Sequence, residues 1–518
     1  MKRTAITRRI SICIALILCC VSGAFPTEGA KGKGHRAKKL VASHTLGSRP
    51  QDPAMTNKGA SRMPALPGSH GPTDAKELEQ FLDKLFTEEM EKEHIPGAVF
   101  VFVKDGAVFF SKGYGFVDLE RTKPVSPERT IFRIGSISKL FTATAVVQLA
   151  DRGKLNLQDD VNRYLKEIKV PATYPQAITA AQLLSHIAGL DEIRPGTQAG
   201  NSAGVLALAA FLQTRLVRIR PPGEVISYST YGITLAGELI EELSGTSFES
   251  YLKTNIWQPL GMDRTSITVP ESQAGDLAMG YEYGGGVNQL QPYEWYHTTP
   301  ASSINSTALD MSKFMLLHLA NRGTAKPILS ERALRDMQRT HARGNPKVPG
   351  VAYGFFEDDY QGVRILEHGG NMAGFSAQLV LLPEGNAGFF MVNHHENSNL
   401  RDTVKWAILE RYYSNLAAIK VPLAKDKYRT RAPMFAGTYR WNVFCHTCPQ
   451  SALGPVLRVS SNEDGTVKLS NSPHRWIEVE PMLFVRDDGK AKIAFQSDKL
   501  GQVKYLYSSG FWVFERTD

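Results

Sequence analysis

The chain has little cysteine, and it has no long hydrophobic run after its amino-terminal segment. Only five of the 518 residues are cysteine, and three of them lie within the first 20 residues. The other two, Cys445 and Cys448, form either a local disulfide or a pair of thiols, because a zinc site would need two further ligands at recognisable spacing. No later segment is long and apolar enough to cross a bilayer. These absences argue against a metal centre and against a membrane-embedded domain.

A motif for nucleic-acid binding is also absent, although the formal net charge is +9. Part of this charge is a cluster of lysine and arginine within residues 25–72, a stretch rich in glycine, proline and serine. Such a composition predicts a disordered basic linker. A solvated tether and a peripheral contact with a membrane or cell wall are the two interpretations of this linker, and nucleic acid is not an expected partner.

The first 24 residues have the layout of a cleavable export signal. A basic start is followed by an apolar run from Ile10 to Val21 and by small residues at 22–24. We therefore expect a signal peptide over residues 1–24 and a periplasmic or extracellular protein. The alternative is an uncleaved membrane anchor.

Two or three domains are expected from the length of the chain. Residues 73–425 predict one mixed α/β domain, because helical and strand patterns at both ends enclose a helical middle. The terminal elements of this domain are a helix over about 74–93, a hairpin at 99–103 and 107–110, strands at 376–382 and 388–392, and a helix over 400–413. The hairpin carries the turn signal Asp105-Gly106.

Short alternating strands follow from residue 435 onward. About eight of them are expected over residues 430–518, with Asp-Gly turns at 464–465 and 488–489. This pattern of short strands and turns predicts a small antiparallel β-barrel, with a β-sandwich as the alternative.

The most informative local pattern is Ser136-x-x-Lys139 at the start of a run that is apolar nearly all round. This spacing places an alcohol beside an amine on a buried helix. A serine hydroxyl becomes a useful nucleophile when a neighbouring base removes its proton. For Lys139 to act as that base, burial must lower its pKa from about 10.4 to about 7, at a cost of about 4 to 5 kcal/mol.

The chain contains its own control for this pattern. Ser250 and Lys253 have the same spacing within an ordinary amphipathic helix, and we interpret that copy as structural.

Two further segments offer what an activated serine requires. Tyr228 lies in a turn before a predicted helix, where a phenol near a lysine could relay protons. Residues 367–375, Glu-His-Gly-Gly-Asn-Met-Ala-Gly-Phe, lead into an apolar strand, and their glycines would allow a close approach of backbone to substrate. A packed core tyrosine and an ordinary strand-edge histidine are the alternative interpretations of Tyr228 and His368, and His186 is interpreted as a structural histidine bonded to backbone.

With these three segments in this order, the chain resembles the serine β-lactamase and penicillin-binding-protein family, in its class C β-lactamase and D-alanyl-D-alanine carboxypeptidase branch. The resemblance covers about residues 75–420 and includes supporting phrases at 182–186, 259–262 and 306–311. It implies an α/β (α+β) fold with an antiparallel sheet flanked by helices and a helical subdomain. The trailing barrel resembles the lipocalin-like domains appended to some members of the family.

The resemblance implies a role for each residue of the three segments. Ser136 would be the nucleophile that forms an acyl-enzyme, Lys139 the activating amine and Tyr228 the proton relay, with the choice between Lys139 and Tyr228 as formal base left open. His368 stands in place of the lysine in the family's third motif and would orient a substrate carboxylate or carbonyl.

The same resemblance implies a substrate-binding role for Gly369, Gly370 and Asn371. The backbone N–H groups of Ser136 and Asn371 would form the oxyanion hole. The family's second motif usually reads Tyr-x-Asn, and here Thr230 occupies the third position. A hydroxyl replaces an amide there and holds a lysine or a substrate less completely, so efficient β-lactam hydrolysis is not expected.

The sequence thus predicts an exported serine hydrolase that acts on an amide or ester carbonyl without a metal or an organic cofactor. Its substrate would be a small molecule or peptide: a D-amino-acid peptide or an ester first, and a β-lactam third. The alternative is a non-catalytic penicillin-binding-protein-like scaffold or cell-wall-binding protein, which Thr230 favours. The oligomeric state is not predicted.

Overall fold

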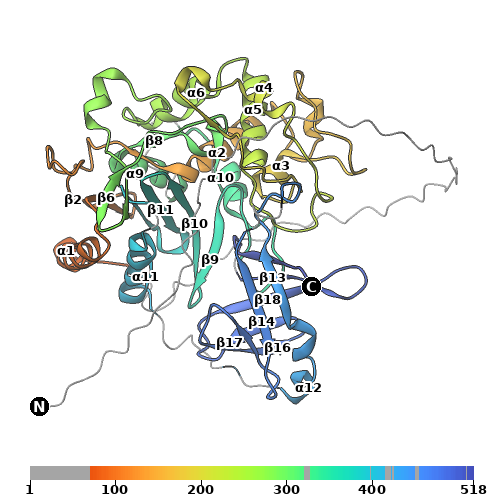
Figure 1. Cartoon of the computed structure of the whole chain (residues 1–518). Helices are drawn as coiled ribbons and strands as arrows, with labels where there is room; N and C mark the ends of the chain where they lie inside the picture. Colours follow the sequence, from red (N-terminus) through yellow and green to blue (C-terminus); the bar gives the residue numbers. More distant parts are fainter. Residues whose placement is uncertain are drawn as a thin grey trace, which may run out of the picture.

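The computed structural model describes residues 71–319, 327–396, 398–414, 422, 425–449, 454–508 and 510–518. It contains a six-stranded sheet with helices on both faces and a closed eight-stranded barrel (Figure 1). The predicted signal peptide and nearly all of the predicted linker lie outside the described residues. Within the described ranges, the helices are all too short or too polar to span a bilayer.

The large sheet is antiparallel throughout, with the order β2-β1-β12-β11-β10-β9. Its strands are β1 (Gly97–Lys104), β2 (Ala107–Gly115), β9 (Phe356–Tyr360), β10 (Val363–Met372), β11 (Phe375–Leu382) and β12 (Ala387–Asn393). The predicted hairpin is confirmed as β1 and β2. Its turn residues Asp105 and Gly106 both have positive φ, 52° and 86°, which the type I′ turn of an Asp-Gly hairpin requires.

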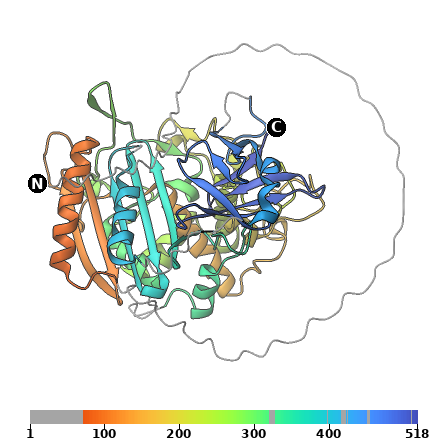
Figure 2. The ribbon, with the colours of Figure 1, turned by 90° about the horizontal axis from the view of Figure 1, so that it is seen from below.

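Helices cover both faces of this sheet. Successive strand residues point to opposite sides, and on β1 the apolar residues of both sides are buried. On β1, Phe100 and Phe102 pack in one core with α1 (Ala75–Lys92) and α11 (Leu400–Tyr412), while Val99 and Val101 pack in the core on the other face. Figure 2 shows α1 and α11 lying along the same side of the sheet. The predicted terminal helices are confirmed, and the Asp74 side chain caps α1 by accepting the N–H of Lys76.

The other face of the sheet is covered by a helical region centred on α2 (Ser138–Asp151). Residues 138–149 of α2 are all buried, as its continuous apolar run predicts. Gly153, with a φ of 71°, follows the end of this helix. The remaining helices are α3 (Ala180–Leu184), α4 (Leu208–Leu212), α5 (Thr230–Ser244), α6 (Phe248–Leu252), α7 (Gln258–Leu260), α8 (Thr299–Ser302), α9 (Ala308–Leu319), α10 (Glu331–Gln338) and α12 (Asp426–Arg429).

The carboxy-terminal strands form a closed barrel in which neighbours in sequence pair in order, and β13 pairs with β20 to complete the ring. Its strands are β13 (Gly437–Trp441), β14 (Val456–Ser461), β15 (Val467–Leu469), β16 (Arg475–Glu480), β17 (Leu483–Arg486), β18 (Lys492–Ser497), β19 (Val503–Tyr507) and β20 (Val513–Arg516). Because the ring of strands is closed, the predicted barrel is confirmed and the alternative β-sandwich is wrong. The predicted mixed sheet-and-helix fold is confirmed as well.

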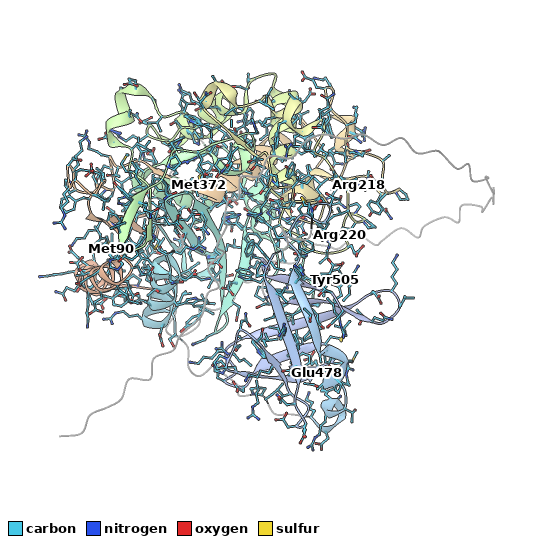
Figure 3. The ribbon with its side chains drawn as sticks, in the orientation of Figure 1. Met90, Arg218, Arg220, Met372, Glu478 and Tyr505 are labelled. Atoms are coloured by element: carbon cyan, nitrogen blue, oxygen red, sulfur yellow. A yellow bond between two sulfur atoms is a disulfide. The ribbon has the colours of Figure 1, made fainter. Side chains whose placement is uncertain are left out.

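The barrel packs directly on the segment that precedes α5. Arg220 pairs with Glu515 of β20 at 3.2 Å, and the Tyr505 hydroxyl of β19 donates to Glu224 at 2.8 Å. In Figure 3, Arg220 and Tyr505 lie close to each other at this junction. A hydrophobic core shared by the two parts contains Val225, Ile226, Val348, Val351, Phe356, Leu483, Ala494, Tyr505, Tyr507 and Val513.

Candidate active site

The predicted nucleophile lies at the amino-terminal end of the central helix, but not inside it. We expected Ser136 to open the helix, and that detail is wrong: Ser136 lies in the 3₁₀ turn η1 (Gly135–Ile137), and α2 begins at Ser138. Gly135 has a φ of 54°, and a Cβ on it would lie 3.0 Å from the backbone nitrogen of Asn371. The chain therefore turns tightly here because Gly135 can adopt this conformation against a neighbouring strand.

Lys139 is the amine beside this serine. Its Nζ donates to Ser136 Oγ at 3.1 Å and to the Ala301 carbonyl at 2.8 Å, and the side chain is almost fully buried. Burial lowers the pKa of Lys139 to about 7, with Glu192 opposing the shift and Arg194 adding to it. This is the value that the sequence argument required of a base for Ser136.

The phenol of Tyr228 completes a group of three side chains. Tyr228 lies just before Ser229, which caps α5, and its ring centroid is 4.7 Å from Lys139 Nζ. Its hydroxyl shares a side-chain hydrogen bond with Ser136, and burial raises the pKa of Tyr228. Two segments that are far apart in sequence thus place an alcohol, an amine and a phenol in contact.

His186 supports the same segment. Its Nδ1 accepts the N–H of Ser229 at 3.1 Å, so the interpretation of His186 as a structural histidine bonded to backbone is confirmed.

His368 lies on β10, next to this group. Residues 367–372, expected to lead into a strand, are themselves the end of β10 and turn directly into β11. His368 Nδ1 donates to the Gly369 carbonyl at 2.7 Å, which leaves a lone pair on Nε2. Burial, together with the positive charge of Lys139, lowers the pKa of His368 to about 3. The ring is therefore neutral at neutral pH, and its Nε2 is available as a hydrogen-bond acceptor.

Strand β10 approaches the turn of the nucleophile very closely. A Cβ on Gly370 would lie 2.0 Å from the Ile134 carbonyl and 3.3 Å from the Ser136 backbone nitrogen. Gly370 is thus required because its lack of a side chain lets the backbone of β10 approach the turn at Ile134–Ser136. The contact brings the backbone of Asn371 beside that of Ser136, as an oxyanion hole built from their N–H groups would need.

Glu192 is a buried residue of the site that sequence reasoning missed. Its side chain is only 6% exposed, and Oε2 accepts the backbone N–H of Thr230 at 2.8 Å. The main chain of Thr230 therefore binds an acid that does not belong to any of the three sequence motifs. Burial raises the pKa of Glu192, whereas Arg194, the N–H of Thr230 and Lys139 act in the opposite direction.

The barrel reaches this site as well. The ring of Phe511, between β19 and β20, packs edge-on against Tyr228 with centroids 5.4 Å apart, and 5.0 Å from Phe356. On the far side of Glu192, the adjacent Asp191 accepts the backbone N–H groups of His446 and Thr447 at 2.8 and 3.1 Å. In the structure the Cys445–Cys448 pair is a disulfide that closes this short loop.

Comparison with known proteins gives consistent matches for the sheet-and-helix part. The family model described as beta-lactamase matches residues 82–413. Protein flp of Staphylococcus aureus (strain N315) is 29% identical over 320 residues, which cover 61% of this chain and 62% of flp. The unguisins hydrolase ungD' of Aspergillus campestris is 28% identical over 334 residues, covering 61% of each chain. The chain thus spans about three fifths of the length of these curated relatives.

A solved structure matches most of the chain. The octameric penicillin-binding protein homologue from Pyrococcus abyssi superimposes with a TM-score of 0.57 at 24% identity. The match covers 86% of this chain and 100% of that one. At this identity the likeness concerns the fold alone.

Proposed function

Because the chain belongs to the beta-lactamase family, we propose that it is a serine hydrolase in which Ser136 attacks an amide or ester carbonyl and forms an acyl-enzyme. The observation that carries the proposal is the 3.1 Å contact of Ser136 Oγ with a buried lysine whose pKa is lowered to about 7. A lysine of this kind is neutral in a large fraction of molecules at neutral pH and accepts a proton from a neighbouring hydroxyl.

The two candidate bases have different protonation states. Burial keeps the phenol of Tyr228 protonated, while Lys139 has a pKa near 7. We therefore assign Lys139 as the base and Tyr228 as the relay. The Ser136 proton passes to Lys139 as Oγ bonds to the carbonyl carbon, and the displaced electron pair goes to the carbonyl oxygen.

The leaving group departs in the second half of acylation. The N–H groups of Ser136 and Asn371 hold the oxyanion, and its electron pair re-forms the carbonyl as the bond to the leaving group breaks. The leaving group takes a proton through Tyr228, which Lys139 reprotonates. Water then attacks the acyl-enzyme by the reverse sequence and releases the acid and Ser136.

The substrate class that we propose is a peptide containing a D-amino acid or a small ester, with β-lactams hydrolysed poorly. Two features support this order. His368 is neutral and supplies no positive charge to the carboxylate that a β-lactam or a free peptide carboxyl terminus would present. Thr230 lacks the side-chain amide of the family's second motif, and its backbone N–H is bonded to Glu192. The relative ungD' is named as a hydrolase of unguisins, which is compatible with a hydrolase function for this chain.

Labelling with a fluorophosphonate probe tests the nucleophile. We expect one adduct in the wild-type protein, none in Ser136→Ala, and an unchanged adduct in Ser250→Ala, the matched control with the same spacing to a lysine. Absence of an adduct in the folded wild-type protein would refute the enzyme assignment and favour a non-catalytic scaffold. A panel of p-nitrophenyl esters, D-alanyl peptides and nitrocefin then ranks the substrates.

We also propose that the protein is exported, with residues 1–24 removed and residues 25–72 serving as a tether. The Cys445–Cys448 disulfide supports an oxidising compartment. Fractionation and amino-terminal sequencing of the mature protein test this proposal. A protein retained in the cytoplasm with residues 1–24 intact would contradict it.

A further inference from the structure

A buried acid lies near the buried lysine of the site: Glu192 is bonded to the backbone of Thr230, two residues after Tyr228, whose ring lies 4.7 Å from Lys139 Nζ. Glu192 belongs to an irregular segment that follows α3, and its backbone N–H is bonded to Asp191 Oδ1 at 2.9 Å. Its Oε2 accepts the N–H of Thr230, the first residue of the 15-residue helix α5. The carboxylate thus lies at the positive end of a long helix, where a negative charge is stabilised.

The charged and titratable groups around Lys139 come from several elements. Glu192 and Arg194 approach it from the segment after α3, Tyr228 from the start of α5, His186 from the end of α3 and His368 from β10. Burial holds both histidines neutral and the phenol protonated. Among these described neighbours, the acid is therefore the group that can offset a positive charge on Lys139.

We propose that Glu192 is a positioning residue for acylation, the carboxylate that stabilises the ammonium formed when Lys139 takes the Ser136 proton. The inference rests on the serine-hydrolase function proposed above. The proton moves from Ser136 Oγ to Lys139 Nζ, and Glu192 neither gives nor takes one. Its charge favours the protonated lysine through the low-dielectric interior, where such interactions are strong.

This role also provides a physical account of the departure in the second motif. An asparagine side chain beside the lysine would supply a dipole, and this chain supplies a full negative charge instead. The backbone N–H of Thr230 holds that charge in place. The site keeps an electrostatic partner for Lys139 although the amide is absent.

The rate of Ser136 labelling by a fluorophosphonate between pH 5 and 10 tests the proposal. The rate should rise as Lys139 loses its proton and then level off. Glu192→Gln keeps the size of the side chain and an acceptor for the Thr230 N–H but removes the charge. In the plot of labelling rate against pH, the rising limb is the range over which Lys139 loses its proton. For Glu192→Gln we expect this limb to move about one pH unit lower, and the labelling rate at pH 9 to fall about tenfold.

Glu241→Gln is the matched control, because Glu241 also accepts a backbone N–H, from Phe248 at 2.6 Å, but lies near the opposite end of α5 from Thr230 and is not among the charges that shift the pKa of Lys139. Its limb should coincide with that of the wild-type protein. Glu192→Asp keeps the charge and should retain the wild-type limb to within about half a unit. A folded Glu192→Gln protein with a wild-type limb would overturn the inference, because a merely structural residue would not move it.

Two further outcomes separate the inference from the function beneath it. A folded wild-type protein that forms no adduct at any pH refutes the proposed function, and with it the inference. If Glu192→Gln does not fold, Arg194→Gln replaces it, because Arg194 is exposed and lowers the pKa of Lys139. Its limb should move toward higher pH, and an unmoved limb overturns electrostatic control of Lys139 by this segment.

Discussion

Replacing Asp191 with asparagine should weaken the attachment of the barrel to the helical region. Both carboxylate oxygens of Asp191 accept hydrogen bonds from the disulfide loop: Oδ1 from the His446 N–H, and Oδ2 from the N–H and hydroxyl of Thr447. The side chain is only 1% exposed. An asparagine amide has one acceptor oxygen, so the donors that face its nitrogen would lose their partner inside the protein.

The pKa of Asp191 gives the size of this effect. Burial alone would raise that pKa, but the hydrogen bonds from His446 and Thr447 outweigh burial and lower it from 3.8 to about 2. At about 1.36 kcal/mol per unit, the ionised form contributes about 2.5 kcal/mol to the free energy of unfolding at pH 7. Because the folded pKa lies below the unfolded one, this contribution is complete above about pH 4 and is lost as the pH falls toward 2.

Urea unfolding followed by tryptophan fluorescence measures the prediction. We expect Asp191→Asn to lower the free energy of unfolding by about 2 to 3 kcal/mol at pH 7, and by about half as much at pH 3. Asp464→Asn is the control, because Asp464 also accepts the N–H and hydroxyl of a threonine, Thr466, but lies exposed in a turn of the barrel, where such bonds contribute little. Equal urea midpoints for Asp191→Asn and the wild-type protein at pH 7 would refute the reasoning.

Three further changes have defined outcomes. Burial and neighbouring acids raise the pKa of Glu238 to about 7, so its ionisation opposes folding above about pH 4.5. Thermal melts should therefore show Glu238→Gln to be more stable than the wild-type protein by about 3 kcal/mol at pH 8 and equally stable at pH 4. Gly370→Ala would place a methyl group against the Ile134 carbonyl, and should slow fluorophosphonate labelling at least about tenfold; a wild-type rate would contradict the close approach. The double change Cys445→Ser and Cys448→Ser should cost up to about 2 kcal/mol in urea unfolding, because the disulfide closes a short loop, and an unchanged midpoint would argue that the loop is held by Asp191 alone.

The fold could be predicted where the sequence pattern is local. The continuous apolar run of α2, the Asp105-Gly106 turn and the alternating strands of the barrel each express a period or a turn requirement within a few residues. The spacing of Ser136 and Lys139 is also local, and the structure places them in contact. The 3₁₀ turn that holds Ser136 was missed because it depends on β10, which lies more than 200 residues further along the chain.

The two neighbouring acids show why the rest could not be predicted. Asp191 and Glu192 form a short charged pair after an apolar segment, a pattern typical of an exposed loop, yet both side chains are buried. Their partners are distant in sequence: Thr230 is 38 residues from Glu192, and His446 is 255 residues from Asp191.

The barrel and the helical region affect these adjacent acids in opposite ways. Hydrogen bonds from the disulfide loop lower the pKa of Asp191, whereas burial raises that of Glu192. Acidification therefore acts on the barrel attachment below about pH 4, while the charge on Lys139 changes near pH 7. Activity should therefore be lost near pH 7, as Lys139 becomes protonated, at a pH where the barrel is still firmly attached, because Asp191, which anchors the barrel, stays ionised until the pH approaches 2.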